Sequence, residues 1–558
     1  MFSKLLVANR GEIAVRIIRT AREMGIATVA VYSDADRDAL HVALADEARH
    51  IGPASPAASY LDGDKLIAVA RECGAQAVHP GYGFLAENAA FARAVAAAGL
   101  TWIGPHPEAI AAMGDKLRAR QAMREAGVPC VPGGLEAIVD AAAAQAAAKE
   151  YGLPLALKAS AGGGGKGLKV ARTEAEIGPA FETARREARA YFKDETIYAE
   201  RYLENPKHVE LQVLADKHGN VIHVGERDCS LQRRHQKLWE ETPARIAESV
   251  RARMREAGVR AAKTIGYDSA GTIECLVSGD EFFFLEMNTR IQVEHTVSEA
   301  ISGLDLVREQ IRVAAGEPLG FTQNDVAFRG FSIEGRVNAE DPAAAFRPAP
   351  GRIAAYREPG GPGVRIDSAA YAGWTIPPDY DSLIAKLIVW APSRDEALAR
   401  MRRALDEYVI DGMPTTVALL RALCDLPTVL DASYGTATLE RFAATFEPAA
   451  RNGLRLPAVA SPPPQRRLAP RLGAARTRER KGSGNDVLSP MHGLVVELNA
   501  GPGDEVAEGQ VVAVIEAMKM MNEIRAQRGG VVSAVHAAAG ATVESGSPLL
   551  TIASEGDA

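Results

Sequence analysis

A repeat close to the C-terminus constrains the fold of this chain more than any other feature of its sequence. Gly493, Gly503, Val506, Gly509 and Ile515 each recur 37 positions later, as Gly530, Gly540, Val543, Gly546 and Ile552. A fixed period of this kind marks an internal structural repeat. Each half contains short β-branched segments bounded by glycines, which predicts strands and turns. We therefore expect the two halves to pair as a flattened β barrel, with a hairpin between them.

The hairpin between the two halves contains a lysine flanked by methionines, in the segment Glu516-Ala-Met-Lys519-Met-Met521. A lysine at a turn is usually only a solvated charge, but large apolar side chains beside it favour recognition by an enzyme that modifies the lysine. This motif within a duplicated β module resembles the biotinyl domain of biotin-dependent carboxylases. Lipoyl domains share the symmetry but usually lack the methionines. The resemblance implies that a biotin protein ligase attaches biotin to Lys519 through an amide bond.

Length, composition and charge limit the remaining possibilities. A chain of 558 residues exceeds the roughly 250–300 residues of a single core, so we expect several domains. The net charge of −7 argues against general nucleic-acid binding. No apolar run approaches the ~20 residues of a membrane span, and no signal-peptide pattern opens the chain, so we expect a cytoplasmic protein without membrane contact. Its five scattered cysteines, none in a CxxC pair, indicate reduced thiols.

The N-terminal segment predicts a β-α-β unit. Residues 4–8 form an apolar strand, an amphipathic helix follows through about Glu23, and residues 27–32 form a second strand, which favours a parallel sheet. No G-x-G-x-x-G follows the first strand, so a dinucleotide site is not expected. The motifs Asn9-Arg-Gly-Glu and His79-Pro-Gly-Tyr-Gly resemble the N-terminal domain of biotin carboxylase.

A glycine-rich loop lies between two predicted strands after residue 114. Four successive glycines begin at Gly162 and are followed by Lys166, with Lys158 at the end of the preceding strand. Such a loop lets backbone N–H groups approach an anion closely. It is not a Walker A loop, because the G-K-[ST] ending and the following helix are missing. A glycine loop between strands resembles the ATP-grasp enzymes instead.

Two later apolar strands are each predicted to carry one carboxylate, Glu274 and Glu286, and Asn288 falls on the same face two residues on. Oxygen ligands of this kind suit Mg²⁺ or Mn²⁺ held together with phosphates. Arg290 and Glu294 follow, and we predict that they form an acid–base pair. Upstream, a strand is predicted to end at Gly225, before a charged run that contains His235 and Lys237.

The resemblance to the biotin carboxylase chain of acyl-CoA carboxylases extends over residues 1 to about 446, and the motifs stand in the same order. It implies an α/β fold with a biotin carboxylase N-terminal domain (1–113), an ATP-grasp domain (114–329) and an α+β C-terminal domain (330–446). A linker rich in Pro, Ala and Arg (447–485) and an all-β biotinyl domain (486–554) would follow. The alternative for the linker is an arginine-rich docking segment for an acidic partner.

The resemblance also implies roles for individual residues. The ATP contacts it implies are Lys116, Lys158, Gly162, Gly163, Gly164, Gly165, Lys166, Gly167, Glu200, Leu203, His208, Gln232 and His235. Glu274, Glu286 and Asn288 match the metal ligands, and Lys237, Arg290, Gln292 and Val293 match the bicarbonate site. Glu294 matches the catalytic base and Arg336 the arginine that binds biotin.

The activity implied is ATP-dependent carboxylation of biotin by bicarbonate, in a homo-oligomer that works with a separate acyl-CoA carboxyltransferase β chain. Three alternatives remain open. Another ATP-grasp ligase is disfavoured by Lys519 and its module, and a non-catalytic biotin carrier is disfavoured by the intact acidic and basic residues. A subunit of a pyruvate- or 2-oxoglutarate-type carboxylase is the third alternative, and nothing in the sequence excludes it.

Overall fold

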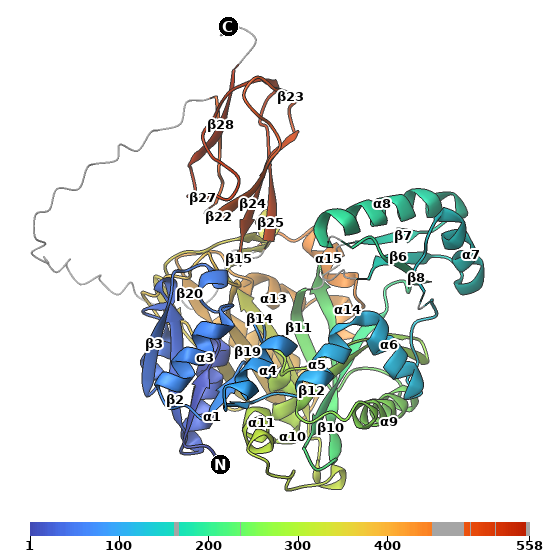
Figure 1. Ribbon diagram of the computed structural model, residues 1–558, viewed down its shortest axis with the longest axis vertical. Coiled ribbons are helices and arrows are strands. Elements are labelled where there is room, and N and C mark those ends of the chain that lie inside the picture. The colour runs from blue at the N-terminus through green and yellow to red at the C-terminus, as the bar shows by residue number, and fades with distance from the viewer. Residues whose placement is uncertain are drawn as a thin grey trace, which may run out of the picture.

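The computed structural model describes residues 1–134, 136–160, 167–192, 194–234, 236–448, 485–491, 493–518 and 520–553. A large body contains the first 448 residues, and a small β domain formed by the C-terminal residues stands on it (Figure 1). No helix in these ranges is long and apolar enough to cross a membrane.

The N-terminal segment forms a five-stranded parallel sheet in the order β3-β2-β1-β4-β5. Alternate residues of β1 face opposite sides of this sheet: Leu5 and Val7 join one apolar core, and Leu6 joins another. The predicted strand, helix and second strand are confirmed. The elements are β1 (Lys4–Val7), α1 (Gly11–Glu23), β2 (Ala27–Ser33), α2 (Leu40–Leu44), β3 (Glu47–Gly52), α3 (Gly63–Glu72), β4 (Ala77–His79), α4 (Ala89–Ala97) and β5 (Thr101–Trp102).

A three-stranded antiparallel sheet, β7-β6-β8, follows and packs against two helices. Strands β6 (Leu155–Ala159) and β7 (Leu168–Ala171) enclose the glycine-rich loop, as predicted, although residues 161–166 of that loop lie outside the described residues. The third strand is β8 (Ile197–Arg201), and the helices are α7 (Ala141–Tyr151) and α8 (Glu174–Phe192).

The centre of the molecule is an eight-stranded sheet in the order β13-β12-β9-β10-β11-β14-β19-β18. It crosses the expected boundary near residue 330, because Trp239 of β11 pairs with Gly335 of β14. The sheet contains β9 (Lys207–Ala215), β10 (Val221–Arg233), β11 (Gln236–Thr242), β12 (Ala270–Ser278), β13 (Glu281–Asn288), β14 (Phe331–Asn338), β18 (Val364–Ser368) and β19 (Leu383–Ala391).

One strand prediction is wrong in its extent. The strand predicted to end at Gly225 continues to Arg233 as β10, then turns back and pairs with β11. The charged run is therefore buried strand as far as Arg233, because its polar side chains find partners on neighbouring strands. Lys237 belongs to β11, while His235 lies outside the described residues.

Helices cover both faces of the central sheet. Helix α10 packs on β10, β11, β14 and β19, while α12 and α13 pack on β14 from the C-terminal segment. The helices of the region are α5 (Pro107–Gly114), α6 (Lys116–Glu125), α9 (Glu248–Thr264), α10 (His295–Ser302), α11 (Leu306–Ala314), α12 (Arg394–Glu407), α13 (Val417–Leu423), α14 (Pro427–Leu430) and α15 (Thr438–Ala443). Short strands β15 (Glu340–Asp341), β16 (Arg347–Pro348), β17 (Ala355–Arg357) and β20 (Val409–Asp411) form two small pairs.

The C-terminal domain consists of two four-stranded sheets, β21-β28-β26-β23 and β25-β24-β22-β27. Each sheet takes strands from both halves of the 37-residue repeat, so the two halves are interleaved around one apolar core. The predicted pairing of the halves is confirmed. The strands are β21 (Asp486–Leu488), β22 (Gly493–Leu498), β23 (Glu505–Val506), β24 (Val511–Ala517), β25 (Met520–Arg525), β26 (Gly530–Val535), β27 (Thr542–Val543) and β28 (Pro548–Ala553).

Candidate active site

A cavity of about 550 Å³ lies where the N-terminal sheet, the β6–β8 sheet and the central sheet meet. Most of the predicted site residues line it, although they come from segments spread over more than 200 positions of the chain. Those on its wall are Lys116, Lys158, Gly167, Glu200, His208, Gln232, Lys237, Glu274, Glu286, Asn288, Arg290, Gln292, Val293, Glu294 and Arg336. Leu203 is described but does not line the cavity. Gly162, Gly163, Gly164, Gly165, Lys166, His235 and Lys519 lie outside the described residues.

The end of the cavity beside the β6–β8 sheet is organised by Glu200. Its carboxylate is buried and contacts both the guanidinium of Arg120 and the ammonium of Lys158. Lys116 lines the same region, and burial lowers the pKa of its ammonium. Two lysines, with Gly167 beside them on the cavity wall, form a surface suited to phosphate groups. Arg120 was not identified from the sequence, because a single arginine in a predicted helix has no distinguishing pattern.

Glu274 and Glu286 face each other across paired strands β12 and β13, as the sequence predicts. Asn288 donates a hydrogen bond to Glu274 over 2.8 Å. Burial raises the pKa of Glu286, and the negative charge of Glu274 raises it further. A divalent cation between these side chains would relieve that repulsion, and oxygen ligands are those that Mg²⁺ and Mn²⁺ prefer. The residues present therefore fit such an ion.

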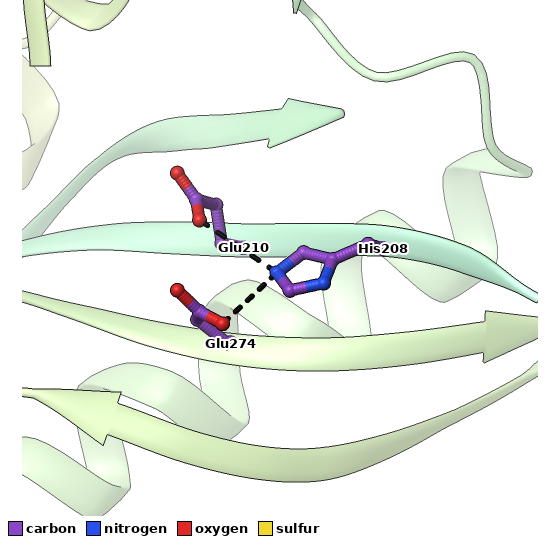
Figure 2. A group of neighbouring side chains, drawn as sticks. All are labelled: His208, Glu210 and Glu274. Carbon is purple, nitrogen blue, oxygen red and sulfur yellow. Dashed lines mark ion pairs between the residues drawn. The ribbon is translucent and has the colours of Figure 1, made fainter. Parts of the chain in front are cut away.

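A histidine and a second glutamate extend this acidic group (Figure 2). The Nε2 atom of His208 lies 3.0 Å from a carboxylate oxygen of Glu274 and 3.9 Å from one of Glu210. Both His208 and Glu210 belong to β9, two positions apart, so they face the same side of the sheet. Burial alone would lower the pKa of His208, but Glu274 raises it above its ordinary value.

Lys237 is the cation at the centre of the site. Its Nζ atom lies 2.6 Å from Glu210, 2.9 Å from Glu274 and 2.7 Å from Glu294. Burial alone would lower the pKa of Lys237, but these three carboxylates raise it well above its ordinary value. Lys237 therefore stays protonated and holds the acidic side chains of three different segments together.

Glu294 lies between two cations, Lys237 and Arg336. The Nη2 atom of Arg336 donates to Glu294 over 2.9 Å. Burial would raise the pKa of Glu294, but Lys237 and then Arg336 hold it well below its usual range. The carboxylate is therefore ionised and able to accept a proton.

The predicted pair of Arg290 and Glu294 is wrong. The Nε atom of Arg290 donates to Glu87 over 2.9 Å, and its Nη2 atom donates to Asn288, also over 2.9 Å. Glu294 begins the turn into α10, where it is nearer to Lys237 and Arg336. Both residues still line the cavity, and the negative charge of Glu294 still contributes to raising the pKa of Arg290.

Several residues of the site were not assigned a role from the sequence. Arg227 is fully buried in β10 and donates to Glu210, Gln212 and Gln292, which fixes the Gln292 amide. Glu240 accepts a hydrogen bond of 2.6 Å from Nε of Arg336. The sequence signal that could have identified such residues is a charged residue between two apolar neighbours in a strand. The segment around Glu210 has this pattern.

The hairpin of the C-terminal domain is confirmed between β24 and β25, where Ala517 pairs with Met520. This pairing leaves two positions for the turn, of which the structure describes the first, Met518. Met518 has a φ of 49°, the left-handed conformation that two-residue hairpins require.

Family models match almost the whole described chain. Residues 1–110 match "Biotin carboxylase, N-terminal domain", and residues 115–322 match "Carbamoyl-phosphate synthase L chain, ATP binding domain". Residues 334–441 match "Biotin carboxylase C-terminal domain", and residues 485–552 match "Biotin-requiring enzyme".

Individual relatives agree with these matches. The chain is 52% identical to biotin carboxylase 1 of Bacillus subtilis over 79% of its own length and 99% of the relative's. It is 53% identical to a pyruvate carboxylase subunit of Methanothermobacter thermautotrophicus over 76% and 86% of the two lengths. The biotin carboxylase domain dimer of Hydrogenobacter thermophilus 2-oxoglutarate carboxylase, solved with MgADP, ADP and bicarbonate, superposes with a TM-score of 0.77 at 50% identity, covering 81% of this chain and 100% of that one.

These matches agree with the geometry of the cavity and with the duplicated β domain. They support ATP-dependent carboxylation of biotin, with biotin as the covalent cofactor and a divalent cation such as Mg²⁺ beside ATP. This chain belongs to the biotin carboxylase family, as an ATP-grasp ligase joined to its own biotin-carrying domain.

Proposed function

We propose that this chain is the α subunit of an acyl-CoA carboxylase. It would carboxylate biotin held on its own Lys519, and a separate β chain would transfer the carboxyl group to an acyl-CoA. The observation that carries this proposal is the fusion of a carboxylase and a carrier without a transferase between them. About 39 residues, 447–485, separate the two parts. A carboxyltransferase needs a sizeable core of its own, which so short a polar segment does not supply.

Each charged residue of the site would have a distinct role in the reaction. Glu294, ionised between two cations, would remove the proton of bicarbonate, and the resulting carbonate would attack the γ-phosphate of ATP to give carboxyphosphate and ADP. Lys237 and Arg290 would stabilise the negative charge that develops on the bicarbonate side. Lys116 and Lys158 would hold the phosphates, together with the glycine loop. Arg336 would orient biotin at the same end of the cavity as Glu294.

Glu274, Glu286 and Asn288 would hold the divalent cation. That ion would supply positive charge to the phosphates of ATP, which bear the charge of the transferred group. His208 and Lys237 already contact Glu274, so they would orient its carboxylate toward the ion.

A pyruvate- or 2-oxoglutarate-type carboxylase is the second candidate. The names of the Methanothermobacter and Hydrogenobacter relatives favour it. The carboxylase half would catalyse the same reaction in either enzyme, so the partner chain determines the acceptor. We also propose a homodimer, since the Hydrogenobacter domain is described as one, and attachment of biotin by a biotin protein ligase.

Identification of the co-purifying chain, followed by an acceptor assay, tests the proposal. The complex is incubated with ATP, Mg²⁺ and labelled bicarbonate, then with acetyl-CoA, propionyl-CoA, pyruvate or 2-oxoglutarate. Label in malonyl-CoA or methylmalonyl-CoA supports the acyl-CoA assignment. Label in oxaloacetate or in carboxylated 2-oxoglutarate supports the second candidate and overturns the first.

A further inference from the structure

The tip of the carrier domain contacts the carboxylase body at one turn. The backbone N–H of Met518 donates a hydrogen bond of 3.2 Å to the carbonyl of Pro378. The Met518 side chain is only 4% exposed and belongs to the apolar cluster of the C-terminal carboxylase segment, which also contains Trp374 and Ile376. The end of the domain formed by β24 and β25 faces the body in Figure 1. Met518 is therefore buried by a domain other than its own.

The contacted turn leads directly into the wall of the active-site cavity. Tyr380, Asp381 and Ser382 line that cavity and follow Pro378 in the chain. Lys519 lies outside the described residues, but it follows Met518 in the sequence. A contact through Met518 therefore holds the carrier hairpin beside a turn that continues into the cavity wall.

The turn is held rigid by the N-terminal domain. The guanidinium of Arg10 lies 4.2 Å from the centre of the Tyr380 ring and donates to Asp36 over 2.7 Å. The hydroxyl of Tyr380 donates to the carbonyl of Ala54 over 2.7 Å and also contacts Ser33. A rigid surface loses little conformational freedom when it is contacted, which favours binding.

We propose that residues 376–382 form the docking surface for the carrier hairpin of the same chain, and that Met518 is the anchor residue that selects this surface. The proposal rests on the proposed attachment of biotin to Lys519. It distinguishes the methionines around the lysine: Met518 precedes it directly, and Met520 and Met521 follow it. Met518 is buried on the carboxylase, whereas Met521 is 42% exposed and faces solvent. Met518 is therefore the methionine of this hairpin that the carboxylase buries most fully, and Met520 is half-buried.

Substitution of Met518 by asparagine tests the anchor. Asparagine tolerates a positive φ, so Met518→Asn keeps the turn and the backbone donor while it removes the buried thioether. Met521→Asn makes the same chemical change at an exposed position and serves as the matched control. Full chains, shown by intact mass to carry biotin, are assayed for the rate at which they label their own biotin from bicarbonate. The same preparations are assayed with free biotin, which does not use the hairpin.

We expect Met518→Asn to slow self-labelling about tenfold or more, as loss of a buried apolar side chain predicts. Its activity on free biotin, and both activities of Met521→Asn, should match the parent. Normal self-labelling by Met518→Asn would overturn the docking proposal. Absence of free-biotin activity in the parent chain would instead overturn the proposed function, so the two failures are distinguishable.

A cysteine pair provides a second measurement that does not depend on rates. Pro378→Cys combined with Met518→Cys places two thiols at residues whose backbones are hydrogen-bonded to each other in the docked arrangement, and a disulfide forms only between residues held close together. Oxidised glutathione should give an internal disulfide between these positions, identified by peptide mapping. Pro378→Cys with Met521→Cys should not form one efficiently. Equal crosslinking of the two pairs would contradict a specific dock through Met518.

Discussion

At the scale of single residues, Glu294 and Arg336 depend on a third side chain, Glu240. Glu240 is fully buried, and burial raises its pKa to about 7 even though Arg336 lowers it. One of its carboxylate oxygens has no hydrogen-bond partner. Arg336 is thus held between Glu240 on one side and Glu294 on the other, and these two carboxylates together orient its guanidinium group.

Glu240 should give the protein a characteristic dependence on pH. Because its pKa in the folded chain is above that of an unfolded glutamate, folding takes up a proton between about pH 4.5 and 7. The stability that Glu240 contributes is present below this window and is lost as the pH rises through it. Glu240→Gln removes the ionisation, so its melting temperature relative to the parent should be higher at pH 8 than at pH 5.5. A melting difference that does not change with pH would contradict the shifted pKa.

Arg336→Ala should slow carboxylation of free biotin while ATP still binds, because Arg336 pairs with Glu240 and Glu294 and not with Glu200, the partner of Lys158. Loss of one charge-assisted contact should lower the rate by on the order of 10²–10³. Nucleotide affinity, measured by calorimetry, should stay close to that of the parent. An unchanged rate with free biotin would show that Arg336 does not orient biotin.

At the scale of elements, the sequence predicted local features and missed long-range pairs. The strands bearing Glu274 and Glu286 and the hairpin at Lys519 were predictable, because their patterns lie within short segments. The pairing of Arg290 with Glu87 was not, since 203 positions separate the two residues. The length of β10 was missed because a strand rich in charged residues is stable only when neighbouring strands supply partners, as Glu210 does for Arg227.

The repeat of the carrier domain makes an element-scale prediction. A Cβ atom on Gly493 would lie 2.6 Å from the carbonyl oxygen of Glu516, and one on Gly530 would lie 2.3 Å from that of Ala553. These two glycines are equivalent in the repeat, and each lets a strand approach its neighbour closely. Gly530→Ala should destabilise the carrier domain by about 1–3 kcal/mol.

Hydrogen exchange of the full chain is the appropriate measurement for this variant, because it reports on the carrier separately. Exchange should accelerate in β26 and β28 of Gly530→Ala while the central sheet remains protected. Val531→Ala, at the next and exposed position, is the control and should resemble the parent. Faster exchange in neither variant would show that the close approach is not required.

At the scale of the whole molecule, the carrier must move between the carboxylase cavity and a second site on another chain. The predicted linker, residues 447–485, falls mostly outside the described residues, so its flexible or docking character stays a prediction. A flexible coil of about 39 residues spans roughly 31–37 Å on average, and full extension would reach about 130 Å. Such a tether keeps biotin near both sites at an effective concentration near millimolar.

Shortening the linker tests this tether. Deletion of about 25 of its residues should leave carboxylation of free biotin unchanged, because the cavity is complete without the linker. Transfer to the acceptor by the reconstituted complex should become slower, because the carrier can no longer reach the second site. Equal rates of acceptor carboxylation by the shortened and parent chains would show that this reach is not needed.

The central claim is that one chain both activates bicarbonate and receives the carboxyl group. The most direct measurement is incorporation of labelled bicarbonate into the purified chain with ATP and Mg²⁺, beside Lys519→Arg and Glu294→Gln. The parent chain should become labelled in an ATP-dependent manner. Lys519→Arg should remain unlabelled because it carries no biotin, and Glu294→Gln should remain unlabelled because it lacks the base. Glu294→Gln should also lose bicarbonate-dependent ATP hydrolysis, whereas Lys519→Arg should retain carboxylation of free biotin. Label in the Lys519→Arg chain, or normal labelling of Glu294→Gln, would contradict this account.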